Sequence, residues 1–385
     1  MDARTLLTEE DLAYCVAIRR QIHRHPELGF DLPQTQALVG RELEKLGLTW
    51  TDRYAPCSAV ACINPDHPGK TVLIRADMDA LPITEKSGEP FTSEEPGKMH
   101  ACGHDAHTAI LLTVARVLCR VREQLPCRVM VLFQPSEECA ESGARCMVEN
   151  GVTEGVDCAL MLHCDNSCPA GFLGVTEKNY AAACDPIQIT LHGRTAHATK
   201  YWEGVDAIQM GMEIWNALSR MGAEVAGDRE HIFRLGVFQG GTAHNVVSDL
   251  CTMEITFRYY DTSLGEAVQK KGRTLIQDIC ARFGGTADIR WETSAPPVVN
   301  DTALAHKYDA SAKKVAGALS GFVSGGMGSE DFAWYLTKIP GVATTLGTGN
   351  VRKGITAVGH TNHYRIDESA FKNGILGFVQ FILDQ

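Results

Sequence analysis

The stretch TVLIRADMD, residues 71–79, decides the fold class. It joins an apolar run, typical of a strand buried on both faces, directly to two aspartates, Asp77 and Asp79. A similar run, RVMVLFQPSEE at residues 128–138, ends in two glutamates. Because a helical pattern over 109–121 separates the two runs, they predict parallel strands joined by a crossover helix.

Working outward, two N-terminal helices within 11–48 and a strand over 59–63 precede this unit, and a strand over 158–162 follows it. From residue 185 the order becomes β-α-β-β-α-β, typical of a ferredoxin-like module with an antiparallel sheet. We therefore predict an α/β fold: a mainly parallel sheet with helices on both faces, interrupted by an inserted α+β domain. The predicted ranges are 1–184 and 295–385 for the larger domain and 185–294 for the insertion.

Composition excludes several classes of protein. The 385 residues carry 36 Lys and Arg against 47 Asp and Glu, a net charge of −11, which disfavours binding to nucleic acid or to anionic membranes. A hydrophobic fraction of 44% is ordinary for a globular protein. The N-terminus lacks an apolar signal region and no run is long enough to span a bilayer, so we expect a cytoplasmic protein with mostly reduced thiols among its 14 cysteines.

One cysteine differs from the others, because Cys102 lies two residues before His104. Polar residues also end other predicted strands: Glu138 follows the run at 128–133, and His163 follows the run at 158–162. Chemistry in parallel sheets gathers at the carboxyl ends of strands. Thiolate, imidazole and carboxylate are ligands of zinc and its first-row neighbours, so these residues, with His360, predict a metal site.

Five motifs in order resemble one group of enzymes. They are RRQIHRHPELGF (19–30), RADMDALPI (75–83), MHACGHDAH (99–107), QPSEE (134–138) and SEDF (329–332). The chain resembles the dinuclear metal amidohydrolases related to aminoacylase and carboxypeptidase G. The nearest branch contains hippurate hydrolases, N-acyl-amino-acid amidohydrolases and auxin-conjugate (IAA-amino acid) hydrolases. The resemblance extends from about residue 12 to the last helix.

The resemblance implies a site with two divalent metal ions, chosen among Zn, Mn, Ni and Co. The ligands it implies are Cys102, His104, Glu138, His163 and His360. Glu137 becomes the general base, which takes a proton from water and hands it to the leaving nitrogen. Asp79 and Asp105 are assigned to holding the ligands in place. His107 is expected to pack or to form hydrogen bonds rather than to bind metal.

The inserted domain carries further candidates by the same resemblance, which implies a lid and dimerisation domain and a homodimer or higher homo-oligomer. His197, in GRTAHA, matches the family histidine that donates to the developing oxyanion, although a structural histidine is the alternative. Asn245 and Arg258 match substrate-recognition positions. Arg258 either holds a substrate carboxylate by two bonds or is an ordinary residue of a strand surface.

Some residues depart from the family pattern near the expected pocket. They are Cys139 and Glu141 after the paired glutamates, Cys164 after His163, and Tyr201 and Trp202 after His197. Because the proposed ligands and Glu137 are intact, we predict an active enzyme with altered selectivity. Its expected activity is hydrolysis of the amide bond of N-acyl amino acids or related small amides and peptides. A non-catalytic metal- or ligand-binding protein of the same fold and a cysteine hydrolase using Cys102 are the alternatives.

Overall fold

The computed structural model describes residues 1–385 and divides into two compact units. The predicted insertion, 185–294, falls within the second of them. Unit 1 comprises Met1–Tyr180, Val299–Gly325 and Asp331–Gln385, and unit 2 comprises Ala181–Val298 and Gly326–Glu330.

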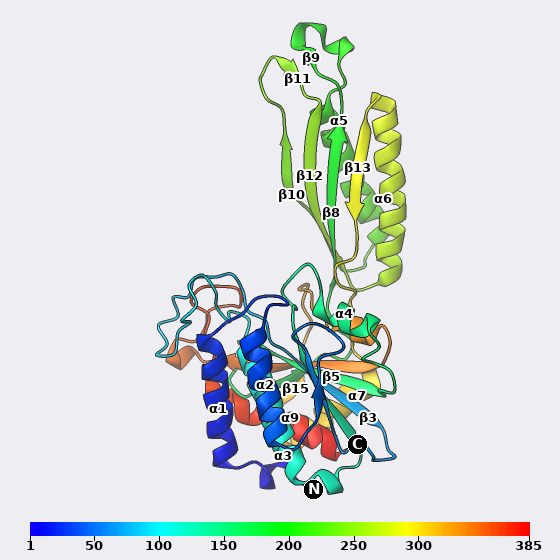
Figure 1. Ribbon diagram of the computed structural model, residues 1–385. Helices are drawn as coiled ribbons and strands as arrows, with labels where there is room; N and C mark the ends of the chain where they lie inside the picture. Colours follow the sequence, from blue (N-terminus) through cyan, green and yellow to red (C-terminus); the bar gives the residue numbers. More distant parts are fainter. The chain divides into compact units, whose positions relative to one another are not determined.

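Unit 1 is built on an eight-stranded sheet with the order β1-β2-β4-β3-β5-β16-β6-β15 (Figure 1). Its four central strands, β4, β3, β5 and β16, run parallel to one another, which confirms the predicted mainly parallel sheet. The strands are β1 (Trp50–Thr51), β2 (Ala59–Ile63), β3 (Thr71–Asp77), β4 (Arg128–Gln134), β5 (Cys158–Pro169), β6 (Leu173–Val175), β15 (Ser320–Phe322) and β16 (Gly341–Gly349).

The strand that decides the fold lies in the interior. Every residue of β3 is buried, and its last residue, Asp77, is level with Gln134 at the end of β4. The carboxyl ends of the two strands therefore present their following loops at the same edge of the sheet.

Helix α3 is the central helix of unit 1, where it packs against β3 and contacts α1 and α9. It begins at His104, earlier than the predicted 109, because Gly103 has a left-handed φ of 96° that turns the chain into the helix. The helices of this unit are α1 (Glu9–Arg24), α2 (Pro33–Lys45), α3 (His104–Arg120), α4 (Gly143–Glu149), α7 (Thr302–Ala316), α8 (Ala333–Leu336) and α9 (Phe371–Leu383).

Strand β16 was not predicted, although it is central and entirely buried. Its sequence, GVATTLGTG, contains glycines typical of turns. The structure explains them by close packing: a Cβ on Gly347 would lie 2.2 Å from the carbonyl oxygen of Pro169, and one on Gly349 would lie 2.1 Å from that of Asn166. Only glycine lets β16 approach β5 so closely.

Unit 2 is a four-stranded antiparallel sheet, β10-β12-β8-β13, with α5 and α6 packed against it (Figure 1). The chain order β8-α5-β10-β12-α6-β13 confirms the predicted ferredoxin-like module. Its elements are β8 (Ala183–His192), α5 (Ala207–Ala226), β10 (His231–Gly240), β12 (Leu250–Tyr259), α6 (Thr262–Phe283) and β13 (Thr286–Trp291), with β9 (Ala196–His197) paired to β11 (Val246–Val247).

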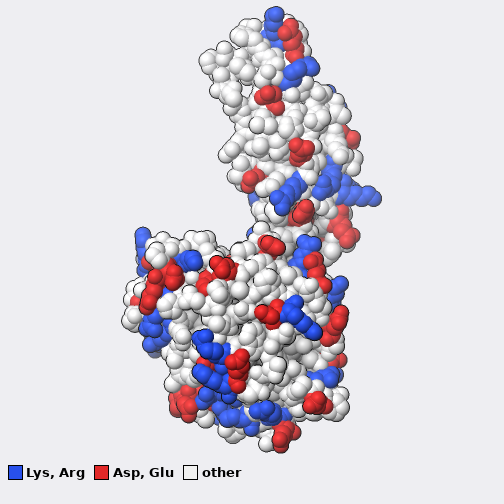
Figure 2. Space-filling model, viewed as in Figure 1, with Lys and Arg blue, Asp and Glu red and all other residues white.

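The surface and the helices show two further properties. Figure 2 shows acidic and basic side chains interspersed over the visible face of each unit. No helix combines the length and the apolar character needed to cross a bilayer.

Candidate metal centre

Strand ends and loops of unit 1 gather the predicted metal ligands. Cys102 lies two residues before α3, His104 begins α3, and Glu138 lies in the loop after β4. His163 lies inside β5, which continues to Pro169, beyond the strand end predicted at residue 162. His360 comes from a loop far along the chain, and its backbone amide donates to the carbonyl oxygen of Ala101, 2.8 Å away. That bond joins the two distant segments at the site.

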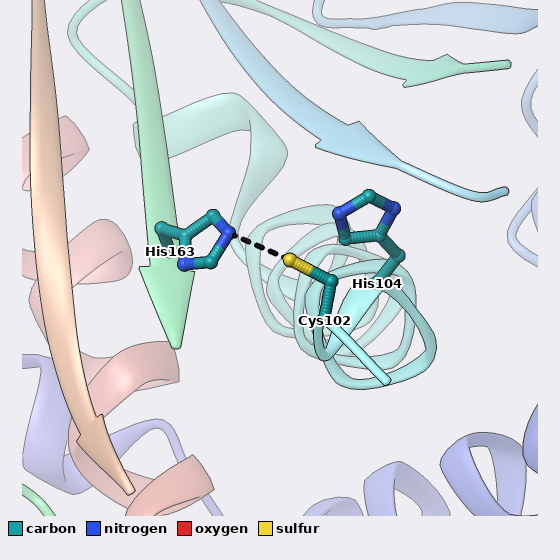
Figure 3. A group of neighbouring side chains, drawn as sticks. All are labelled: Cys102, His104 and His163. Atoms are coloured by element: carbon teal, nitrogen blue, oxygen red, sulfur yellow. Dashed lines mark hydrogen bonds between the residues drawn. The ribbon is translucent and has the colours of Figure 1, made fainter. Parts of the chain in front are cut away.

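Three short contacts define the cluster. Cys102 Sγ lies 3.3 Å from His163 Nε2 (Figure 3). His360 Nε2 lies 3.2 Å from Glu138 Oε1, and His104 Nε2 lies 3.7 Å from the same oxygen. Ligand-type atoms within 4.8 Å of one another form overlapping groups that a metal ion can bind: Cys102, His104 and His163; Cys102, Glu138 and His360; and His104, Glu137 and Glu138.

Hydrogen bonds fix which ring nitrogen of two histidines faces the cluster. His104 Nδ1 lies 2.8 Å from the carbonyl oxygen of Asp79, and His163 Nδ1 lies 2.8 Å from that of Cys164. A carbonyl oxygen only accepts, so each Nδ1 carries a proton, and in the neutral ring Nε2 is the nitrogen whose lone pair can bind a metal ion. Both lone pairs face the cluster, as metal-binding histidines require.

Two buried atoms of the cluster, His104 Nε2 and Glu138 Oε1, form no well-directed hydrogen bond, although His360 Nε2 lies 3.2 Å from Glu138 Oε1. Burying polar atoms without partners is costly, so such atoms call for an explanation. Burial alone lowers the pKa of His104, but the charge of Asp77 and the hydrogen bond to Asp79 outweigh it and hold that pKa well above its usual value. Burial and nearby Glu138 raise the pKa of the Cys102 thiol. The donor set fits a divalent cation, whose charge favours the thiolate.

Asp79 holds the loop that carries the two glutamates. Its carboxylate accepts from the backbone amides of Glu137 and Glu138, each 3.0 Å away, while its carbonyl oxygen accepts from His104. One residue therefore orients two ligands and the proposed base. Ser136, the residue before Glu137, has a left-handed φ of 55°, and His360 has a left-handed φ of 63°. Strained backbone of this kind concentrates at functional sites.

Asp105 and His107 contact other groups. Asp105 Oδ2 accepts from Arg19 Nε at 2.7 Å and lies 2.7 Å from His23 Nδ1. Asp105 forms no hydrogen bond with a proposed ligand, so no direct contact supports its predicted role. His107 Nε2 accepts from the amide of Cys164 at 2.9 Å, so its Nδ1 donates to Asp77 at 2.6 Å. With both nitrogens engaged, His107 joins strand ends as a hydrogen-bonding residue.

Comparison with known proteins identifies the family. Residues 73–384 match the peptidase family M20/M25/M40. The chain belongs to this family. A thermostable carboxypeptidase of Saccharolobus solfataricus is 32% identical over 94% of this chain and 93% of its own length. An N-acyl-L-amino acid amidohydrolase of Geobacillus stearothermophilus is 33% identical over 76% of this chain and 80% of its own.

A solved structure agrees with this placement. A Bacillus subtilis protein, named as a dinuclear metal binding peptidase of family M20, has a TM-score of 0.85 and 31% identity over 98% of each chain. This chain is therefore an M20-family hydrolase that acts on carbon–nitrogen bonds.

Unit 2 holds the other candidate residues of this M20 hydrolase. His197 and Asn245 lie together, because β9 pairs with β11 and the amide of Ala198 donates to the carbonyl oxygen of Asn245 at 2.9 Å. Arg258 lies near the opposite end of β12, where its Nη1 donates to the carbonyl oxygen of Met327 at 3.1 Å. Within unit 2 the two predicted substrate-binding residues, Asn245 and Arg258, thus do not converge.

The residues that depart from the family pattern fall into two groups. Cys139, Glu141, Tyr201 and Trp202 are exposed. Cys164 is buried, and a Cβ added at Gly103 would lie 3.1 Å from Cys164 Cβ, so Cys164 packs behind the ligands.

A buried network of polar residues was not predicted from the sequence; it joins Arg75, Asp77, Gln134, Ser142 and Asp331 by hydrogen bonds. Three of these lie in the quoted motifs RADMDALPI and QPSEE, and Asp331 lies in SEDF. A buried Arg75 inside an apolar strand was the signal available, since buried arginines need partners.

Proposed function

We propose that this protein is a metal-dependent amidohydrolase that cleaves the amide bond of N-acyl amino acids or small peptides. Two divalent ions would be held by Cys102, His104, Glu138, His163 and His360. One observation supports the proposal most directly. His104 and His163 each donate a hydrogen bond from Nδ1 to a carbonyl oxygen, and Nε2 of each ring faces a thiol or a carboxylate. His104 Nε2, which is buried without a hydrogen-bond partner, supports the same conclusion.

An amide is a weak electrophile with a poor leaving group. Divalent ions supply Lewis acidity, which polarises the carbonyl and makes water a better nucleophile at neutral pH. Glu137 would act as the base, because it is adjacent to the ligand Glu138 and its amide is fixed by Asp79. It would accept the proton of the attacking water and return it to the departing nitrogen.

The proposed substrate class is based on the relatives of this chain and on the candidate residues of unit 2. Relatives at about one-third identity include a carboxypeptidase, an N-acyl-L-amino acid amidohydrolase, an N-acetyl-L-cysteine deacetylase and an IAA-amino acid hydrolase. Their shared chemistry is an acylated amino acid. We assign unit 2 to a lid and dimerisation role, with His197 as oxyanion donor and Asn245 and Arg258 as substrate contacts. The exposure of His197 and Asn245 leaves both available for such contacts.

A cysteine hydrolase is the second candidate, because the 3.3 Å contact of Cys102 with His163 also suits a thiol and its base. The carboxylates around this pair favour metal instead. The two candidates differ in their response to chelation.

The test is hydrolysis of a panel of N-acyl amino acids, followed by mass spectrometry, with the protein as isolated, after chelation and after adding back Mn²⁺, Zn²⁺ or Co²⁺. We expect loss of turnover on chelation and recovery with metal. Full turnover without metal, together with irreversible loss on thiol alkylation in excess metal, would instead establish the cysteine mechanism. Metal binding without turnover on any panel member would support the non-catalytic alternative.

A further inference from the structure

Asp331 is buried in unit 1 and its carboxylate collects an unusual number of donors. Oδ1 accepts from Arg75 Nη2 at 2.8 Å, and Oδ2 accepts from Ser142 Oγ at 2.7 Å and from the amide of Ala144 at 3.2 Å. Gln134 Nε2 reaches both oxygens, at 2.9 and 2.8 Å. Hydrogen bonds to an ionised carboxylate are the strong ones.

These donors lie on both sides of one loop. Gln134 is the last residue of β4 and Ser142 directly precedes α4, so residues 135–141, which include Glu137 and Glu138, run between them. The loop is closed at its base, since the amide of Gly143 donates to the carbonyl oxygen of Ser136 at 2.9 Å. Asp331 therefore binds the entry and the exit of the loop that carries the proposed base and a proposed ligand.

The same carboxylate reaches a second ligand through Arg75. Arg75 Nη1 donates to Asp77 Oδ2 at 2.5 Å, and Arg75 Nε donates to Gln134 Oε1 at 2.9 Å. Asp77 Oδ1 in turn accepts from His107 Nδ1 at 2.6 Å, and His107 lies in the first turn of α3, the helix that begins at His104. Asp331 and Asp77 thus share one buried guanidinium, which couples the end of β3 to the glutamate loop.

We propose that Asp331 is a positioning residue that fixes the Glu137–Glu138 loop directly and the first turn of α3, where His104 lies, through Arg75 and Asp77. The inference rests on the proposed metal-dependent function. Because the carboxylate binds both ends of the loop, its loss should free the backbone on both sides of Glu137 and Glu138. Removing outer partners of metal ligands commonly weakens metal binding or activity about 10- to 100-fold.

Asp331→Asn tests the proposal with little change in volume. Arg75 keeps Asp77 as its ionic partner, so folding is preserved, but the new amide NH₂ faces donors where an oxygen accepted. We expect Mn²⁺ affinity, measured by competition with a chromophoric chelator, to fall about 10- to 100-fold. At saturating Mn²⁺, kcat should fall more than KM changes.

Asp11→Asn is the matched control. Asp11 is also a buried acid of unit 1, bonded to Arg116 and Arg120 near the far end of α3. With a rise of about 1.5 Å per residue, that end of α3 lies roughly 20 Å from His104. The control should lose stability while keeping the parental Mn²⁺ affinity. Equal Mn²⁺ affinity in parent, Asp331→Asn and Asp11→Asn would overturn the proposal.

Two further measurements keep the test decisive. If Asp331→Asn does not fold, Ser142→Ala removes one donor, and parental affinity in that variant would overturn the proposal. Hydrogen exchange of residues 134–144 in metal-free protein provides a readout that needs no activity. Faster exchange there in Asp331→Asn than in Asp11→Asn supports the positioning role even if the parent hydrolyses no panel substrate, an outcome that would contradict only the proposed function.

Discussion

The two units present their candidate residues in opposite ways. In unit 1, His104, Asp77 and Asp79 are buried and each is held by a neighbour in the same cluster. In unit 2, His197 and Asn245 are exposed, and the ring of His197 is bonded only to Thr199, two residues away. The candidate site residues of unit 1 therefore also stabilise its interior, whereas those of unit 2 do not.

This difference predicts how substitutions behave. A change among the interlocked residues of unit 1 should alter stability and metal binding together, because removing one partner leaves others unsatisfied in the interior. A change at the exposed residues of unit 2 should alter turnover alone, since exposed side chains contribute little to stability.

Glu137→Ala should have the largest effect on turnover. It tests whether unit 1 contains a residue that acts in the reaction without also binding metal or stabilising the fold. Loss of the proposed base should lower kcat by about 10²- to 10⁴-fold. Metal content, measured by elemental analysis, should stay at the parental level because Glu138 and the other ligands remain. Glu149→Ala removes an exposed carboxylate at the end of α4, so it is the control and should keep parental turnover. Near-normal turnover in Glu137→Ala would remove the base assignment.

His197→Ala makes the corresponding test in unit 2. If His197 donates to the oxyanion, its loss should lower kcat by about 10²- to 10³-fold. The unfolding midpoint should not move, because the side chain is exposed. His192→Ala changes another exposed histidine of unit 2, bonded to Asp288, and should leave both quantities at parental values. A drop in thermal stability with unchanged kcat would identify His197 as structural.

Gly103→Ala tests how closely the residues around the unit 1 site are packed. A Cβ there would lie 3.1 Å from Cys164 Cβ and 3.2 Å from the Tyr364 hydroxyl, at a φ of 96°. We expect a loss of about 1–3 kcal/mol in urea denaturation, with weaker metal binding as Cys102 and His104 shift. Gly97 also has a positive φ, but a Cβ there would meet nothing within 4 Å. Gly97→Ala therefore measures the cost of the backbone conformation without the cost of packing. Equal losses in the two variants would contradict the packing argument.

Much of the fold followed from local patterns, whereas β16 did not. The apolar run of β3 and the polar residues after it identified a buried parallel strand and its functional end. β16 contains three glycines, a residue typical of turns. In the folded chain they allow β16 to approach β5 closely, which the sequence does not reveal. Glycine permits both turns and tight packing, so sequence alone does not distinguish them.

The residues of the candidate site also differ in how far the sequence alone could identify them. Residues whose type matches a metal's chemistry, such as Cys102 and His163, were found because thiolate and imidazole beside strand ends are informative by themselves. Asp331 was quoted only as part of a motif, because a carboxylate bound by Gln134 and Ser142 is recognisable only when the tertiary structure brings those donors to it. Asp331 therefore carries no local signal of such a role, unlike Asp79, which lies just after a buried strand.

Asp185, the buried carboxylate of unit 2, should give the smallest effect. It accepts from Tyr259 and Trp291 at 3.2–3.3 Å, and no cation contacts it, whereas buried Asp11 in unit 1 has two arginines. Burial raises the pKa of Asp185, and bonds from Thr293, Trp291 and Tyr259 only partly offset this. For Asp11, the bonds from Arg120 and Thr8 outweigh burial and hold its pKa below the usual value.

The sign of the pH dependence follows. A raised pKa means that folding favours protonated Asp185, so its contribution to stability is greatest below the ordinary carboxyl pKa and is lost as pH rises through the folded value. Asp185→Asn should therefore stabilise unit 2 at pH 7, on the order of 1 kcal/mol, and change little in acid. Asp11→Asn should act oppositely, destabilising unit 1 at pH 7 because it removes an ionic partner. Hydrogen exchange in β8 and β12 assigns the change to unit 2. Slower exchange there at pH 7 is expected, and faster exchange would mean that the charge of Asp185 stabilises the unit after all.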